Sequence, residues 1–190
     1  MIVAIGNPPS SGSTYLADLL DSLPFAVCGP ELNLFAVSAH FLDWTRAREN
    51  GLPNSRSAAA YVRRQRLEQW RLANYGVDRV SLNRMVSESD SFPEFCEELF
   101  RVFSTLRGKD CRLFFEKSPQ NIHCVREFLE SFPDSYFVHL VRDPLYVFRS
   151  LLKRGFPPYV TMATWLIDEA QAFGVRDHER VISLRYEDLV

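Results

Sequence analysis

Small polar residues gather near the amino terminus in the stretch Gly6–Thr14 (GNPPSSGST), where their types and spacing suit the binding of an anion. The short apolar run Ile2–Ile5 precedes this stretch, and apolar residues at helical spacing follow it. A strand, a glycine-rich loop and a helix in this order direct backbone N–H groups and the positive end of a helix dipole at an anion. Three hydroxyl side chains would add donors: Ser11, Ser13 and Thr14. The stretch predicts a loop that binds phosphate or sulfate, the alternative being an ordinary Ser/Gly turn before a helix.

The loop lacks the features of a loop that hydrolyses nucleotides. Such loops carry a lysine directly after the second glycine, whereas here Ser13 follows Gly12. Five residues, rather than four, separate Gly6 from Gly12, and no apolar strand ends in an aspartate placed to hold magnesium. The dinucleotide pattern Gly-x-Gly-x-x-Gly is also absent. The sequence therefore predicts an anion site but does not favour ATP as its ligand.

A second candidate for anion binding follows a later buried strand. The apolar run Ser135–Val141 ends at Arg142, Asp143 and Pro144, where aspartate suits a helix N-cap and proline suits the first helical position. Arg142 would then lie at the carboxyl end of a strand, and Ser150 would lie two turns into the next helix. Ligands of open α/β sheets bind off the carboxyl ends of the strands. A guanidinium and a hydroxyl there would suit a second phosphate, although Arg142 paired with Asp143 is the alternative.

Strands and helices alternate along most of the chain. This alternation predicts an α/β fold, a three-layer domain with a parallel sheet covered on both faces. The expected strands are Ile2–Ile5, Phe25–Cys28, Arg112–Glu116, Tyr136–Val141 and Val181–Arg185, and the expected helices are 13–23, 122–131, 145–153 and 160–173. A helical insertion over about 36–110 would interrupt the alternation, with helices at Ala58–Tyr75 and Phe92–Leu106. We expect residues 1–190 to form one domain.

Composition restricts the function classes. The chain has 190 residues, is 46% apolar and carries a net charge of −2, which argues against general binding to nucleic acid. Its four cysteines have no metal-ligand spacing and are expected to be reduced core thiols. A strand that begins at Ile2 leaves no room for a signal peptide, and no apolar run is long enough to span a membrane. These features predict a soluble, cytoplasmic protein.

Five segments of the chain, in this order, resemble sulfotransferases that use 3′-phosphoadenosine 5′-phosphosulfate (PAPS), especially their bacterial and tyrosylprotein branches. The Arg142/Ser150 spacing and the Tyr-Glu-Asp-Leu sequence that begins at Tyr186 are the most specific of the matches. The segments are Pro9–Leu16, Cys28–Glu31, Phe115–Asn121, Phe137–Ser150 and Ser183–Leu189.

The resemblance implies a P-loop-like cradle for the 5′-phosphosulfate of PAPS. The loop residues Ser10, Ser11, Gly12, Ser13 and Thr14 would form this cradle. Arg142 and Ser150 would bind the 3′-phosphate that distinguishes PAPS from ordinary adenylates. The aromatic rings of Tyr15 and Tyr186 would contact the adenine.

The resemblance also implies how transfer would proceed. Sulfuryl transfer passes in line through an electron-poor sulfur, so that positioning and charge stabilisation dominate, by analogy with phosphoryl transfer. Glu31 would act as the general base on an acceptor hydroxyl, and Lys117 would stabilise negative charge on the sulfuryl and leaving groups. The product would be 3′-phosphoadenosine 5′-phosphate (PAP), and no metal would be required. The acceptor would be a small-molecule or peptide hydroxyl, and His40 could share the role of base with Glu31.

Two departures from the family pattern keep other functions open. Loops of the resembled family carry lysine or arginine where this chain has Ser10, so the cation would have to come from elsewhere, with Lys117 or an arginine of the insertion as candidates. The family fold continues beyond the strand that ends near Tyr186, so its last part would be missing after Val190. The alternatives are a non-catalytic nucleotide-binding domain of the same fold and a P-loop kinase of small molecules.

Overall fold

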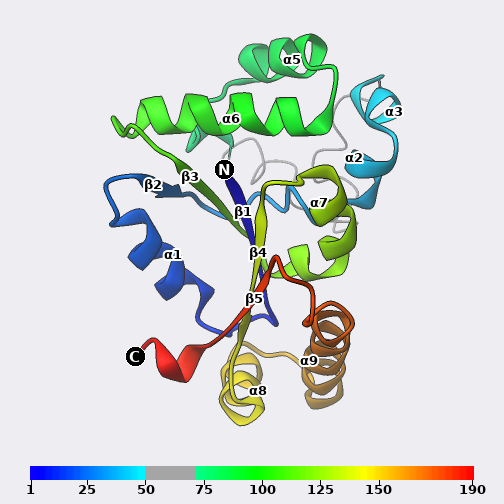
Figure 1. Ribbon diagram of the computed structural model, residues 1–190. Helices are drawn as coiled ribbons and strands as arrows, with labels where there is room; N and C mark the ends of the chain where they lie inside the picture. Colours follow the sequence, from blue (N-terminus) through cyan, green and yellow to red (C-terminus); the bar gives the residue numbers. More distant parts are fainter. Residues whose placement is uncertain (50–71) are drawn as a thin grey trace.

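A five-stranded parallel sheet forms the centre of the computed structural model, which describes residues 1–49 and 72–190 (Figure 1). The strand order is β2-β3-β1-β4-β5, so that the first strand of the chain is the central one. All five residues of this strand are buried, as its apolar sequence predicts. The strands are β1 (Ile2–Gly6), β2 (Ala26–Cys28), β3 (Leu113–Lys117), β4 (Tyr136–Val141) and β5 (Val181–Arg185).

Helices cover both faces of the sheet, which confirms the predicted three-layer α/β fold (Figure 1). One face packs against α1, through Leu16 and Ala17, and the other face packs against α6, α7 and their neighbours. The helices are α1 (Ser13–Asp21), α2 (Ser38–Leu42), α3 (Trp44–Glu49), α5 (Arg79–Glu88), α6 (Phe92–Leu106), α7 (Val125–Ser131), α8 (Pro144–Lys153) and α9 (Pro158–Phe173), with 3₁₀ turns η1 (Pro119–Cys124) and η2 (Tyr186–Asp188).

Phenylalanines fill the space between the sheet and the helices opposite α1. The ring of Phe35 lies 4.9 Å from that of Phe128 and 6.0 Å from that of Phe92, and Phe128 lies 5.0 Å from Phe132. Burying each such side chain fully contributes about 1.5–3 kcal/mol. This cluster fixes the segment after β2, which includes Glu31, against the sheet.

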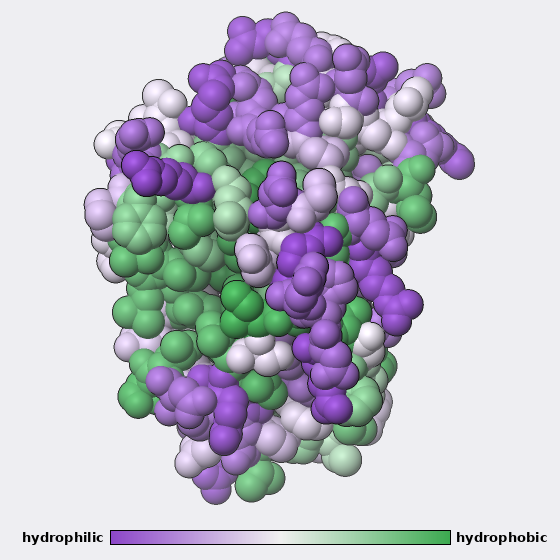
Figure 2. Space-filling model, viewed as in Figure 1, coloured by the Kyte–Doolittle hydropathy of each residue, from purple (hydrophilic) through white to green (hydrophobic). Residues whose placement is uncertain are grey.

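The face that carries α1 is less completely covered. Figure 2 shows a broad apolar area on this side of the molecule. Leu19 of α1 and Ile182 of β5 remain 42% and 44% exposed. Of the helices that the structure describes, none crosses β5 on this face (Figure 1).

Most expected elements form close to their expected bounds, and the differences have local causes. The bounds of β4, β5 and α6 agree with the predictions. The helix expected over 13–23 ends at Asp21, where Lys109 donates hydrogen bonds to the carbonyl oxygens of Asp21 and Ala26 and thereby holds the turn between α1 and β2. The helix expected over 122–131 is instead the turn η1 followed by α7.

The insertion contains more helices than the sequence pattern indicates. Helix α5 was not predicted, although Asp78 caps it by accepting a hydrogen bond of 2.7 Å from the backbone N–H of Ser81. The expected helix Ala58–Tyr75 lies largely outside the described residues. The arginines of that helix, which were candidates for the missing cation, lie wholly outside them.

Candidate functional site

Parallel pairing brings three segments of the predicted site to one end of the sheet. Ile5 is paired with Lys117 across β1 and β3, and Gly6 is paired with His139 across β1 and β4. Arg142 follows β4 directly. The anion loop, Lys117 and Arg142 therefore meet at the carboxyl edge of the three central strands, near α8 (Figure 1).

Residues 7–12 form a tight turn that leaves the start of α1 open. Asn7 Nδ2 and Ser11 Oγ each donate a hydrogen bond of 2.7 Å to the carbonyl oxygen of Pro8. Ser10 and Gly12 have left-handed backbone conformations, with φ of 70° and 90°. No side chain caps the N-terminus of α1, and no acidic residue lies in its first turn. The first N–H groups of α1 are therefore available to an anion, while the Ser11 hydroxyl is engaged within the loop.

An aromatic ring and a guanidinium cover the loop. The Tyr186 ring packs directly on Gly12, where a β-carbon would overlap the ring. The guanidinium of Arg142 lies 4.2 Å from the centre of the same ring, and its Nη1 donates a hydrogen bond of 3.2 Å to the carbonyl oxygen of Ser10. The Nε of Arg142 is buried and has no hydrogen-bond partner among the described residues. Arg142 is therefore not neutralised by Asp143, whose carboxylate instead accepts the N–H of Leu145.

A second arginine reaches the loop from the far end of α8. Nη1 of Arg154 donates a hydrogen bond of 3.1 Å to the hydroxyl of Ser10. The sequence does not predict this contact, because nothing in the spacing of an exposed arginine after a helix indicates that it turns back to a loop more than 140 positions earlier.

The other predicted cofactor residues lie around this cluster with fewer contacts. The Tyr15 ring is 41% exposed and meets the Tyr186 ring edge-on at 6.3 Å. Ser13 is buried and Thr14 is exposed at the start of α1. Ser150 is half-buried, and within the described residues its hydroxyl has no hydrogen bond to Arg142.

The two predicted catalytic side chains form an ion pair. Nζ of Lys117 donates a hydrogen bond of 2.9 Å to a carboxylate oxygen of Glu31. The Lys117 side chain is 7% exposed, whereas that of Glu31 is 34% exposed. The structure thus places a carboxylate that can accept a proton beside an ammonium that can stabilise negative charge, at the carboxyl end of β3.

A buried carboxylate that the sequence analysis did not single out holds these segments together. Glu116 is fully buried and accepts hydrogen bonds from the backbone N–H of Leu32 (3.0 Å), Ser118 Oγ (2.5 Å) and Asn121 Nδ2 (2.5 Å). Ser118 Oγ in turn accepts the N–H of Asn33. The network ties the segment after Glu31 to the end of β3. Burial raises the pKa of Glu116 above its ordinary value, against the opposing effect of these hydrogen bonds.

The raised pKa of Glu116 predicts a pH-dependent stability. Between the ordinary pKa of 4.5 and the raised one, the folded protein binds a proton that the unfolded chain has released, so the free energy of unfolding falls as pH rises through this window. The contribution is at most about 1.4 kcal/mol per pH unit. We expect Glu116→Gln to remove it, which urea unfolding between pH 4.5 and 7.5 would measure. The exposed Glu179→Gln serves as control. An unchanged pH slope in Glu116→Gln would contradict the assignment.

Other groups that could do chemistry are engaged elsewhere. His40 is buried, its Nδ1 lies 3.0 Å from the carbonyl oxygen of Leu34 and its ring packs on Phe92, which favours a structural role over that of a base. All four cysteines are free, and burial raises the pKa of Cys28 to about 12.

Among the described residues, no group of three or more His, Cys, Asp or Glu side chains could hold a metal ion. None of the described helices is both long and apolar enough to cross a membrane.

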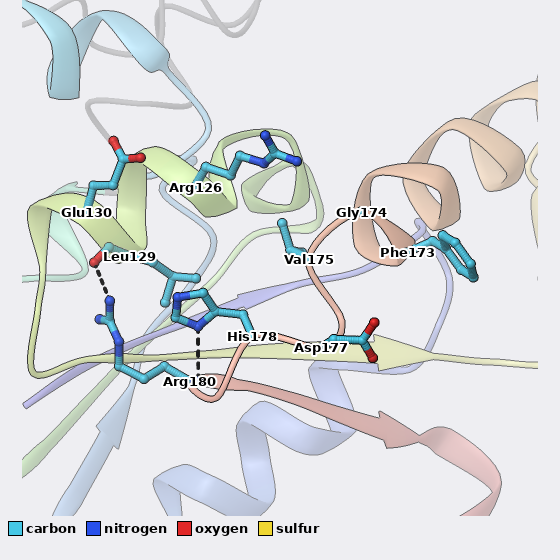
Figure 3. Close-up of a pocket in the computed structure, with 9 residues that line it drawn as sticks. All are labelled: Arg126, Leu129, Glu130, Phe173, Gly174, Val175, Asp177, His178 and Arg180. Carbon is cyan, nitrogen blue, oxygen red and sulfur yellow. Dashed lines mark hydrogen bonds between the residues drawn. The ribbon is translucent and has the colours of Figure 1, made fainter.

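A pocket of about 320 Å³ lies away from this site, between α7, the end of α9 and the start of β5 (Figure 3). Arg180 at its edge donates hydrogen bonds to the carbonyl oxygens of Leu129 and Phe132. The Arg180 guanidinium is thus used to join the turn before β4 to β5. The pocket-lining residues His178 and Arg180 precede β5, so the pocket lies at the amino end of this strand, whereas the anion loop follows the carboxyl end of β1.

Solved structures with the same fold are bacterial sulfotransferases and sulfotransferase domains. The chain is 19% identical to the sulfotransferase domain from the curacin biosynthetic pathway, with a TM-score of 0.64, over 100% of this chain and 68% of that one. It is 23% identical to the sulfotransferase domain of the Synechococcus PCC 7002 olefin synthase, with a TM-score of 0.65, over 100% and 66% of the two chains. A sulfotransferase from Alicyclobacillus acidocaldarius matches with 14% identity and a TM-score of 0.52, over 98% and 73%. The chain thus spans about two thirds of the length of the first two.

No curated protein is significantly similar to the chain. A sequence profile of the sulfotransferase family, in contrast, matches residues 3–190. This match takes in the anion loop, both predicted catalytic residues and the segment around Tyr186. The chain belongs to the sulfotransferase family.

Proposed function

We propose that this protein transfers a sulfuryl group from PAPS to a hydroxyl group of an acceptor and releases PAP. The observation that supports the proposal most directly is the position of Arg142. Its guanidinium is held between the Tyr186 ring and the anion loop, it has no ion-pair partner among the described residues, and its Nε is buried without a hydrogen bond. A half-buried arginine whose buried Nε has no partner fits a ligand that carries phosphate groups.

The residues present fit such a ligand in type and in charge. The open N-terminus of α1 and the left-handed turn before it suit the 5′-phosphosulfate, and Arg142 suits the 3′-phosphate. Tyr186 and Tyr15 offer aromatic surface for the adenine. The loop has no lysine after Gly12, which is the residue that a loop for ATP requires.

Glu31 and Lys117 would divide the chemistry between them. When bound, PAPS supplies an electron-poor sulfur and a phosphate leaving group. Glu31 accepts the proton of the acceptor hydroxyl as the acceptor oxygen bonds to sulfur. Lys117 stabilises the negative charge that the leaving phosphate gains as its bond to sulfur breaks. The ion pair between the two side chains keeps both groups together at the carboxyl end of β3.

Comparison of two nucleotides tests the proposal. We expect PAP to bind in calorimetry and to raise the melting temperature, whereas ADP with magnesium should do neither. Radiolabelled PAPS would then be incubated with alcohols, phenols, sugars, lipids and peptides that carry hydroxyl groups, and label in any of them shows transfer. Binding of ADP with magnesium but not of PAP would indicate a kinase. Binding of PAP without transfer to any acceptor class would indicate a nucleotide-binding domain that does not catalyse transfer.

A further inference from the structure

The anion loop has no positive charge of its own. Residues 6–14 include no lysine, arginine or histidine. The loop relies on backbone N–H groups and on the dipole of α1, which acts like roughly half a positive charge. A phosphosulfate ester carries more negative charge than this, so a further cation close to the loop would strengthen binding considerably.

Two arginines supply charge to the same loop residue from opposite ends of one helix. Arg142 precedes α8 and donates to the carbonyl oxygen of Ser10, while Arg154 follows α8 and donates to the hydroxyl of Ser10. Within the described part of the chain, no carboxylate lies within ion-pair distance of either guanidinium. Two like charges that converge on one residue repel each other, and a bound nucleotide with several negative charges would relieve that repulsion.

The end of α8 is shaped so that Arg154 can reach back to the loop. The helix ends at Lys153, and the N–H of Arg154 still donates to the carbonyl oxygen of Leu151. Gly155 then takes a left-handed conformation with φ of 84°, which stops the helix. The Arg154 guanidinium lies 5.4 Å from the centre of the Phe156 ring, and this cation–π contact helps to orient the arginine side chain.

We propose that Arg154 is the cation of the anion loop. Its hydrogen bond to Ser10 holds its guanidinium where it can bind the 5′-phosphate end of the nucleotide. The inference rests on the proposed function and assigns to Arg154 a binding role that Lys117, ion-paired with Glu31, does not fill. Arg142 then serves the 3′-phosphate, and Arg154 the end at which the sulfuryl group is transferred. Ser10 is the residue that fixes the Arg154 guanidinium in place.

The wild type and four variants test the role of Arg154 by calorimetry with PAP and with AMP. Arg154→Ala should weaken the binding of both nucleotides about 5- to 30-fold, because both carry the 5′-phosphate. Ser10→Arg alone should give no gain, because its guanidinium would be repelled by Arg154. Ser10→Arg combined with Arg154→Ala should bring affinity back to within about threefold of the wild type, since a charge is again present at the loop. Lys153→Ala removes one positive charge from the preceding residue and should leave affinity unchanged.

Each contrary outcome has a distinct meaning. Arg154→Ala that binds PAP like the wild type would overturn the proposal, as would a loss confined to PAP, which would place Arg154 at the 3′-phosphate. A gain from Ser10→Arg of equal size in both backgrounds would also overturn it, because the two positions would then act independently. If the wild type bound no PAP, the proposed function would fail. The wild type and the same four variants titrated with inorganic sulfate would then decide whether Arg154 supplies the charge of the loop.

Discussion

Glu31→Gln is expected to lower the rate of sulfuryl transfer by about 10²- to 10⁴-fold while the affinity for PAP stays close to that of the wild type. Glutamine keeps the size of the side chain and an oxygen that can accept the hydrogen bond from Lys117, but it cannot accept a proton at neutral pH. The loss would therefore fall on the chemical step and not on the binding of the nucleotide.

Turnover and PAP affinity of Glu31→Gln would be measured on the same preparation, with an acceptor found in the screen described above. Glu130→Gln, which changes an exposed carboxylate remote from the loop, serves as the matched control. A Glu31→Gln protein with the full rate would show that another group takes the proton. A parallel fall in affinity and rate would instead show that the Glu31–Lys117 ion pair supports the structure of the site.

The second large effect is expected for Arg142→Ala, which should weaken PAP binding about 10- to 150-fold and AMP binding far less. This range corresponds to the loss of one charge-assisted hydrogen bond of about 1.5–3 kcal/mol. AMP lacks the 3′-phosphate, so it should be largely insensitive to the guanidinium that we assign to that group.

Arg142 also contacts Ser10 and Tyr186, and a further variant separates these contacts from the charge. Arg142→Lys keeps a positive charge but lacks the planar guanidinium that stacks on Tyr186. We expect it to recover only part of the affinity. Arg149→Ala, an exposed residue on α8, is the control. Equal losses for PAP and AMP in Arg142→Ala would show that Arg142 acts by shaping the loop and not by binding the 3′-phosphate.

The sheet was predictable because its strands are short apolar runs in an alternating order. Tyr136–Val141 and Val181–Arg185 form as expected, since local composition and period suffice to define them. The predicted bounds of two helices were wrong where a side chain from a distant part of the sequence forms hydrogen bonds at the helix end. Lys109 holds the turn after α1, and Asn121 binds the carbonyl oxygen of Ile5 in β1 at the point where a continuous helix was expected. Such contacts over about a hundred positions have no signature in a local pattern.

The candidate site shows the same division. The positions of the loop, Arg142 and Lys117 at one end of the sheet could be predicted, because each lies in a recognisable segment and the strands are parallel. The functions assigned to these residues and to Glu31 stay predictions. The contacts of Arg154 and Glu116 could not be predicted, because they depend on where a side chain turns after a helix end or inside a buried network. The hydroxyl of Ser11, which the sequence predicts to face an anion, donates a hydrogen bond to the carbonyl oxygen of Pro8 instead. This contact depends on the backbone conformation of the loop, which the sequence pattern does not give.

The contact between Tyr186 and Gly12 has a consequence for how the protein is made. The loop is synthesised well before its covering residues Arg142, Arg154 and Tyr186, which follow it by more than 130 positions. A nascent chain that has reached only β4 would therefore hold this loop without the side chains that cover it. Pairing of such widely separated residues is also slow in folding, so that the loop is covered only after β5 has been made and has joined the sheet.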